Sequence, residues 1–117
     1  MTTPAELRAL ADRCKAAGSL PEHLRDAELQ LIDRAIRDLE LVEEGRGFRF
    51  YTRDLSKVKL LVPQGYEWAA GVEDGSAFAC VHPPDIYLPL SECLTPELSL
   101  CAAALEAQAR VLEAQSE

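Results

Sequence analysis

Four residues between positions 80 and 101 carry side chains that could bind a metal ion or attack an electrophile: Cys80, His82, Cys93 and Cys101. Thiolates and imidazole are suitable ligands for tetrahedral zinc. Structural zinc sites usually take paired ligands two to four residues apart, whereas here only Cys80 and His82 are close in sequence. The spacing therefore argues against zinc, and we expect no metal and no cofactor.

A cysteine nucleophile needs a base to activate it and a third group to orient that base. The sequence indicates no orienting group for Cys80 and His82, and His23 falls in the first turn of an expected helix. We therefore predict no catalytic residue and no enzyme activity. A metal or thiol protein centred on Cys80 and His82 remains an alternative interpretation.

The four cysteines lie in apolar patterns and not at the spacings of a disulfide framework, so we expect free thiols in a reducing compartment. Cys14, Cys80 and Cys101 fall on apolar faces and are expected to be shielded. Cys93 falls in an irregular segment at 91–95 and is expected to be the most reactive.

Other sites are disfavoured by context or charge. Gly45-Arg46-Gly47 leads into an apolar run, which is the wrong context for a phosphate-binding loop. The net charge of −8 would repel a phosphate backbone, so we expect no direct nucleic-acid binding. Several acidic residues form either solvated surface, which we favour, or an acidic docking face: Glu40, Glu43, Glu44, Glu67, Glu73 and Asp74.

The stretch from Gly65 to Pro84 is expected to be a β-hairpin. Tyr66, Trp68 and Ala70 alternate on its first arm, and residues 77–81 form a nearly continuous apolar second arm. Asp74-Gly75 marks a tight turn between them. A further edge strand is expected from Ile86 to Leu90, and a weaker strand signal covers residues 48–51.

Helical patterns flank the hairpin. Thr3-Pro4-Ala5-Glu6 predicts a capped helix to about Ala17, and Ser19-Leu20-Pro21-Glu22 a second one to about Glu43. Thr52 is expected to cap a short helix through Leu61, and Thr95-Pro96-Glu97 to open a final helix. The stripe expected on the second helix is Leu24, Ala27, Leu31, Ile32, Ala35, Ile36, Leu39 and Val42. The stripe expected on the final helix is Leu98, Cys101, Ala102, Leu105, Ala109 and Leu112.

These elements predict one α+β domain spanning residues 1–117, a small layered sandwich. A central antiparallel β-hairpin or three-stranded sheet is covered by the N-terminal helices and a long C-terminal helix. Apolar residues make up 48% of the chain and charged residues 27%, as in ordinary globular proteins. The expected structural core includes Trp68, Phe78, Leu105, Ile32 and Leu39. The start of the chain lacks a secretion signal and no stretch is long enough to span a membrane, so we expect a cytoplasmic protein without membrane contact.

The final helix also bears on association. Leu100 and Val111 extend its apolar surface beyond the expected stripe. If another helix of the chain covers them, the protein is a monomer; if not, a two-fold dimer would bury them. We favour the dimer.

Four segments resemble the phage ABA-sandwich proteins of bacterial prophages: LADRCKAAG at 10–18, YTRDLSKVKLLVPQGYEW at 51–68, GSAFACV at 75–81 and TPELSLCAAALEAQA at 95–109. Residues 53–61 are more basic than that pattern, and residues 85–94 form a longer segment. The resemblance implies a small α+β sandwich encoded by a phage or prophage and located in the bacterial host cell. It supplies no catalytic residues.

The sequence therefore favours a small acidic phage or prophage accessory protein that acts by protein-protein contact with a host or phage protein. Two alternatives remain. One is an acidic inhibitor whose carboxylates mimic the phosphates of nucleic acid and occupy the groove of a host defence or transcription protein. The other is the metal or thiol protein described above.

Overall fold

The computed structural model describes residues 2–39, 51–84 and 90–115. In chain order, its elements are α1 (Pro4–Ala16), the 3₁₀ turn η1 (Ala17–Ser19), α2 (Glu22–Asp38), α3 (Leu55–Val58), the 3₁₀ turn η2 (Lys59–Leu61), β1 (Glu67–Glu73), β2 (Ser76–His82), β3 (Ser91–Cys93) and α4 (Pro96–Gln115). The strands form an antiparallel sheet in the order β1-β2-β3. The predicted α+β fold, with a three-stranded sheet covered by the N-terminal helices and a long C-terminal helix, is confirmed.

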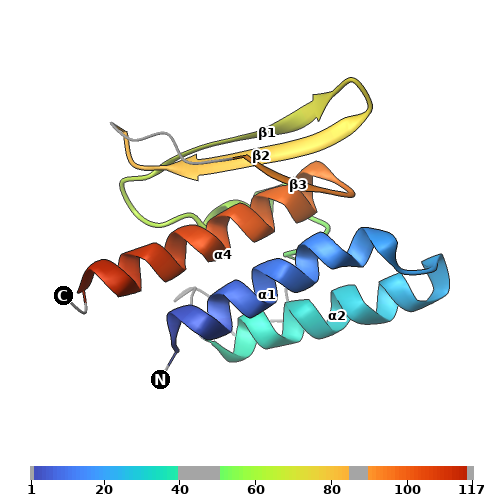
Figure 1. The fold of residues 1–117 in the computed structure, drawn as a ribbon, viewed down its shortest axis with the longest axis horizontal. Helices are drawn as coiled ribbons and strands as arrows, with labels where there is room; N and C mark the ends of the chain where they lie inside the picture. Colours follow the sequence, from blue (N-terminus) through green and yellow to red (C-terminus); the bar gives the residue numbers. More distant parts are fainter. Residues whose placement is uncertain (1, 40–50, 85–89, 116–117) are drawn as a thin grey trace.

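Helix α4 lies in the middle of the molecule, with the sheet on one side and α1 and α2 on the other (Figure 1). Every residue of Leu98–Leu105 is buried. A helix covered on opposite sides needs apolar or small residues around most of its circumference, and the alanines of α4 allow close packing. The helices described here include none that is both long and apolar enough to cross a membrane.

The central position of α4 bears on the expected dimer. Leu100 is fully buried within the chain, and Val111 is half-buried. Leu100 is therefore not available for a contact between two copies. Whether the protein associates through another surface stays a prediction.

The start of α1 follows its sequence signal. Thr3 is the N-cap, and its Oγ1 accepts a hydrogen bond from the Glu6 backbone N–H at 3.2 Å. The Thr3 hydroxyl in turn donates to Glu6 Oε1. The capping prediction for the second helix is wrong. Pro21, and not Ser19, occupies the N-cap of α2, and it makes no side-chain capping bond.

The inward face of α2 differs from the expected stripe. Leu24 and Leu31 are 49% and 51% exposed, whereas Ile32 and Ile36 are buried together with Leu29 and Asp33. Successive helical residues are about 100° apart, so Leu31 and Ile32 cannot both face the centre of the same contact. As the outermost helix, α2 buries one narrow stripe, and Leu39 at its end is partly buried against the core.

The short helix after residue 51 begins later than expected. Asp54, and not Thr52, caps α3 by accepting a hydrogen bond from the Ser56 backbone N–H at 3.0 Å. Val58 and Leu61 are buried, but Leu55 is exposed. Thr52 instead bonds to Asp33 of α2.

The predicted hairpin and its turn are confirmed. Glu73 pairs with Ser76, which leaves Asp74 and Gly75 as a two-residue turn. Their φ angles are 52° and 80°, and positive φ at both positions defines the type I′ turn that suits the twist of a hairpin.

A third described strand occupies part of the segment that was expected to be irregular. Strand β3 spans Ser91–Cys93, and Cys93 pairs with Ala77 of β2 and does not lie in an irregular segment. Positions 86–89 fall outside the described residues. So do the end of the second helix near Glu43, the Gly45-Arg46-Gly47 break and positions 48–50 of the weak strand signal; Tyr51 lies in a turn.

Candidate protein-interaction surface

The sheet separates the four residues that suggested a metal site. Side chains alternate between the two faces of a strand. Ala77, Ala79 and Val81 of β2 are buried on the face toward α4, so Cys80 and His82 belong to the outer face. Cys93 is opposite Ala77 on the inner face, and Cys101 is fully buried in α4. Across the described ranges, no group of three or more His, Cys, Asp or Glu residues could hold a metal ion.

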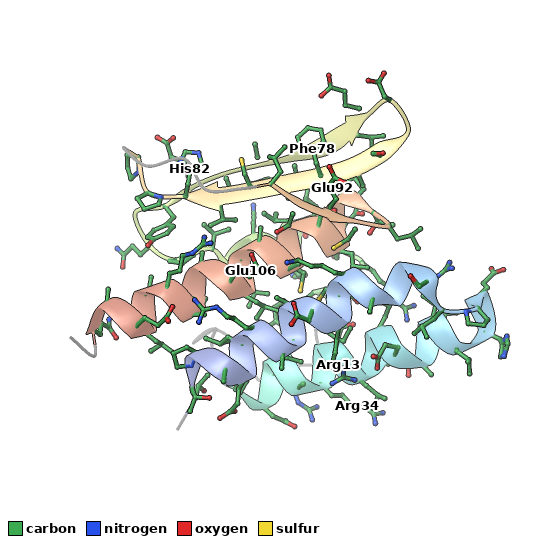
Figure 2. All side chains as sticks on the ribbon, in the orientation of Figure 1. Arg13, Arg34, Phe78, His82, Glu92 and Glu106 are labelled. Atoms are coloured by element: carbon green, nitrogen blue, oxygen red, sulfur yellow. The ribbon has the colours of Figure 1, made fainter. Side chains whose placement is uncertain are left out.

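His82 lies at the end of β2, opposite Glu67 of β1 (Figure 2). Its Nδ1 is 2.7 Å from the carbonyl oxygen of Pro83. Because a carbonyl oxygen only accepts hydrogen bonds, this contact places a proton on Nδ1. The side chain is nearly buried, and this bond to the backbone holds its ring at the end of the strand.

Three of the four thiols gather on the helical side of the sheet, and all four cysteines are free. Cys14 of α1 and Cys101 of α4 are fully buried. A hydrogen bond with Cys14 and burial raise the pKa of the Cys101 thiol. Burial raises the pKa of the Cys93 thiol to about 12. Few thiolates form at neutral pH in such surroundings, so these two thiols are poor nucleophiles.

The residue that departs furthest from expectation is Trp68. It was expected in the core, but its side chain is 40% exposed. Trp68 pairs with Val81 and therefore lies on the inner face of the sheet, as its alternation with Ala70 predicts. The helical layer covers the inner face at β2 more fully than at the β1 edge, where Val72 is also 62% exposed.

Phe78 was also expected in the core and instead lies half-buried on the outer face, paired with Gly71 and Glu92 (Figure 2). A Cβ atom added to Gly71 would lie 3.4 Å from Phe78 Cζ, so the glycine leaves room for the ring to lie against β1. Beside this ring is an open hollow of about 290 Å³. Its lining residues are Glu73, Asp74, Ser76, Phe78, Leu90 and Glu92.

The charges of the sheet are of one sign. Residues 60–109 contain seven acidic residues and no lysine or arginine: Glu67, Glu73, Asp74, Asp85, Glu92, Glu97 and Glu106. Four of these, Glu67, Glu73, Asp74 and Glu92, are exposed on the sheet or its turn. The helices differ, because their acidic residues are partly paired, as in the ion pairs Arg13–Glu28 and Lys15–Glu106. The sheet is therefore the more negative side of the described molecule.

We define the β1 surface as Trp68, Ala70 and Val72 on the inner face together with Glu67 and Glu73 on the outer face. It combines exposed apolar side chains with carboxylates at both ends of one edge strand. Alternation predicted which residues share a face. Alternation does not say which strand lies at the edge, and this explains why Trp68 was expected to be buried.

Comparison with protein-family models, curated proteins and solved structures finds no match for this chain. The resemblance to phage ABA-sandwich proteins therefore stays a prediction.

Proposed function

We propose that this protein is a small non-enzymatic accessory protein that acts by binding another protein through the β1 surface. The observation that carries the proposal is the exposure of Trp68 and Val72 on one face of β1, on either side of Ala70. Tryptophan is enriched among the residues that dominate binding energy at protein interfaces. An exposed tryptophan that shares a strand face with an exposed valine is therefore an anchor for a partner.

The class of partner follows from charge and from the resemblance. A net charge of −8 and a sheet side without lysine or arginine favour a protein with a cationic surface over a nucleic acid. The resemblance to phage ABA-sandwich proteins supports an origin in a phage or prophage. The partner would then be a host or phage protein in the cytoplasm of a bacterial cell.

Affinity capture from a bacterial host lysate tests the proposal with three forms of the protein. Wild type and Leu31→Lys should retain the same partner, whereas Trp68→Lys should lose it. Leu31 is a matched control because it is a similarly exposed apolar residue on α2, the helix furthest from the sheet (Figure 1). With the purified partner, Trp68→Lys should raise Kd at least about tenfold, a loss typical of an interface anchor. A partner retained equally by Trp68→Lys would contradict the proposal.

The absence of lysine and arginine from residues 60–109 also favours a second function, an acidic inhibitor that mimics nucleic acid. Such a mimic would depend on carboxylates more than on Trp68, because phosphate-binding sites recognise negative charge. Replacing Glu73, Asp74 and Glu92 by their amides should then abolish competition with DNA for the target, while Trp68→Ala should preserve it. The opposite pattern would favour binding through the β1 surface.

A further inference from the structure

We infer that β1 binds its partner by strand addition, and that the partner supplies an extended cationic segment that pairs with the free edge of the sheet. This inference rests on the proposed function and specifies how the same surface works. Added strands gain affinity from main-chain hydrogen bonds and specificity from alternate side chains. The backbone of β1 can supply the main-chain hydrogen bonds, and its side chains and charge can supply the specificity.

The backbone of β1 provides an unpaired edge within the described part of the chain, where β2 is the only strand that pairs with it. In an antiparallel hairpin with a two-residue turn, the residues flanking the turn exchange hydrogen bonds, and such pairs alternate along the strands. Glu73 and Ser76 flank the turn, so Glu73, Gly71 and Ala69 direct their amides toward β2. Trp68, Ala70 and Val72 direct their N–H and C=O groups to the free edge.

The side chains of Trp68, Ala70 and Val72 share the inner face of the sheet. An added strand would place every second side chain on that same face, next to Trp68 and Val72. Apolar residues at these positions would cover the surface that α4 leaves exposed. The hydrogen-bonding edge and the apolar anchor therefore come from the same three residues.

The outer face sets the charge of the partner. Glu67 and Glu73 lie on this face at the two ends of β1, and both are exposed. A lysine or arginine opposite each glutamate would form a favourable cross-strand pair. No lysine or arginine lies between positions 60 and 109, and within this stretch His82 of β2 is the cross-strand partner of Glu67. The partner segment is thus about seven residues long, apolar at alternate positions and basic at both ends.

A second copy of this chain fits the edge less well. If two β1 strands paired antiparallel along their full length about Ala70, each Glu67 would lie opposite the Glu73 of the other copy. Like charges directly opposite one another destabilise a sheet, and charged residues on edge strands are a common protection against self-association. The carboxylates that attract a cationic strand therefore oppose pairing of β1 with itself.

The peptide KVTVTVK has the predicted pattern and serves as the probe for full-length protein. In free protein, the amides of Trp68, Ala70 and Val72 should exchange quickly with solvent, whereas those of Ala69 and Gly71 should be protected by β2. Saturating peptide should slow exchange at the first three amides at least about tenfold and leave the other two unchanged, because only edge amides gain an acceptor. Trp68 is the sole tryptophan, so its fluorescence should report the same binding curve.

Three controls separate strand addition from other binding. The peptide EVTVTVE should bind at least about tenfold more weakly, since it places glutamates opposite Glu67 and Glu73. N-methylation of the central valine of KVTVTVK removes the N–H that would donate to the Ala70 carbonyl oxygen and places a methyl group between the two strands, so it should weaken binding at least about tenfold. Equal binding of the acidic peptide, or unchanged exchange at the edge amides with saturating KVTVTVK, would overturn the inference.

Two further outcomes identify which proposal fails. Concentration-dependent protection of the edge amides without peptide would make a second copy the occupant and overturn the inference of a cationic partner. A partner whose capture depends on Trp68 but which leaves the edge amides unprotected would overturn strand addition alone and preserve the proposed function. Capture that is independent of Trp68 would overturn both.

Discussion

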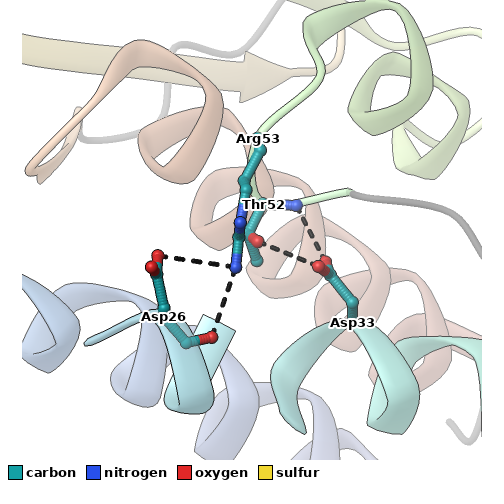
Figure 3. Close-up of polar contacts among 4 residues, drawn as sticks. All are labelled: Asp26, Asp33, Thr52 and Arg53. Atoms are coloured by element: carbon teal, nitrogen blue, oxygen red, sulfur yellow. Dashed lines mark hydrogen bonds and ion pairs between the residues drawn. The ribbon is translucent and has the colours of Figure 1, made fainter. Parts of the chain in front are cut away.

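Asp33 accepts two hydrogen bonds from Thr52. The Thr52 backbone N–H donates to Asp33 Oδ1 at 2.9 Å, and the Thr52 hydroxyl donates to Oδ2 at 3.1 Å (Figure 3). Both residues are buried. The next residue, Arg53, donates to the Asp26 backbone oxygen at 3.2 Å. Thr52 and Arg53 are therefore both hydrogen-bonded to α2, the outermost helix. These bonds fix α2 relative to the segment that leads into α3.

The Asp33 carboxyl predicts a pH dependence of stability. Burial raises the pKa of Asp33 above its ordinary value of 3.8, although the hydrogen bonds from Thr52 oppose this shift. Native protein therefore holds this proton more tightly than unfolded protein. The stabilisation that results is complete below pH 3.8 and is lost as pH rises through the native pKa. Asp33→Asn lacks this titration, so the stability of wild type relative to Asp33→Asn should fall as pH rises from below 3.8 toward neutral.

Denaturant unfolding of wild type and Asp33→Asn across this pH range measures whether the difference between their free energies of unfolding falls or rises with pH. At neutral pH, Asp33→Asn should remain folded because its amide can accept from the Thr52 N–H and donate to the hydroxyl. Asp33→Ala should lose about 1–3 kcal/mol because it leaves the Thr52 N–H buried without its acceptor. A wild type that gains stability relative to Asp33→Asn as pH rises would contradict the raised pKa.

The Asp74-Gly75 turn predicts a cost for adding a side chain. Gly75 has φ of +80°, and a Cβ atom there would meet nothing within 4 Å, so the cost comes from backbone conformation alone. Gly75→Ala should destabilise the protein by about 1–2 kcal/mol. Gly18→Ala is the control, because Gly18 lies outside the left-handed region and its added Cβ would make an ordinary contact with Leu94. Equal losses in thermal unfolding would contradict this account.

Trp68 should contribute less to stability than a core residue. Trp68→Ala is expected to cost about 1–2 kcal/mol, whereas Leu105→Ala should cost about 2–5 kcal/mol, the range for emptying a buried leucine site. Leu105 is fully buried in α4, and Trp68 already contacts solvent. Chemical denaturation of both variants measures the two losses. A loss of about 3–5 kcal/mol for Trp68→Ala would mean that Trp68 acts as a core residue and not as an exposed anchor.

The contrast between Thr3 and Leu31 shows what the sequence can predict. A helix cap or a tight turn depends on residues that are close in sequence. The Thr3 cap and the two-residue turn at Asp74-Gly75 therefore form as the local sequence predicts. The faces of a helix depend on its neighbours. Leu31 and Ile32 were equally apolar in sequence, and only the outermost position of α2 determines that Leu31 is exposed.

The same reasoning applies to the candidate site. The alternation of Trp68 and Ala70 correctly predicts a shared face, because side chains alternate in any strand. Burial of that face depends on strand order, a long-range property of the sheet, and β1 lies at its edge. Cys93 was placed in an irregular segment for a related reason, since a three-residue strand is defined mainly by its pairing with β2.

The positions of the thiols lead to a revised order of reactivity. Cys80 lies half-buried on the outer face of the sheet, whereas Cys14 and Cys101 are fully buried between α1 and α4. Cys93 is also half-buried, but burial raises its pKa to about 12, so few of its thiols are ionised near pH 8. We therefore predict that Cys80, and not Cys93, reacts first with a disulfide reagent such as Ellman's reagent.

Native protein should show one fast reaction followed by slow reaction of the remaining thiols, and Cys80→Ser should remove the fast phase. Cys93→Ser is the matched control, since it changes a half-buried thiol on the opposite face and should leave the fast phase intact. Adding denaturant should expose all four thiols at a common rapid rate, because the differences arise from the fold. Cys93 packs beside Ser99, whose Oγ accepts a hydrogen bond from the Cys93 backbone N–H at 3.0 Å, and this packing is expected to protect its thiol. A fast phase that disappears in Cys93→Ser would show that the Cys93 thiol is accessible and would contradict this expectation.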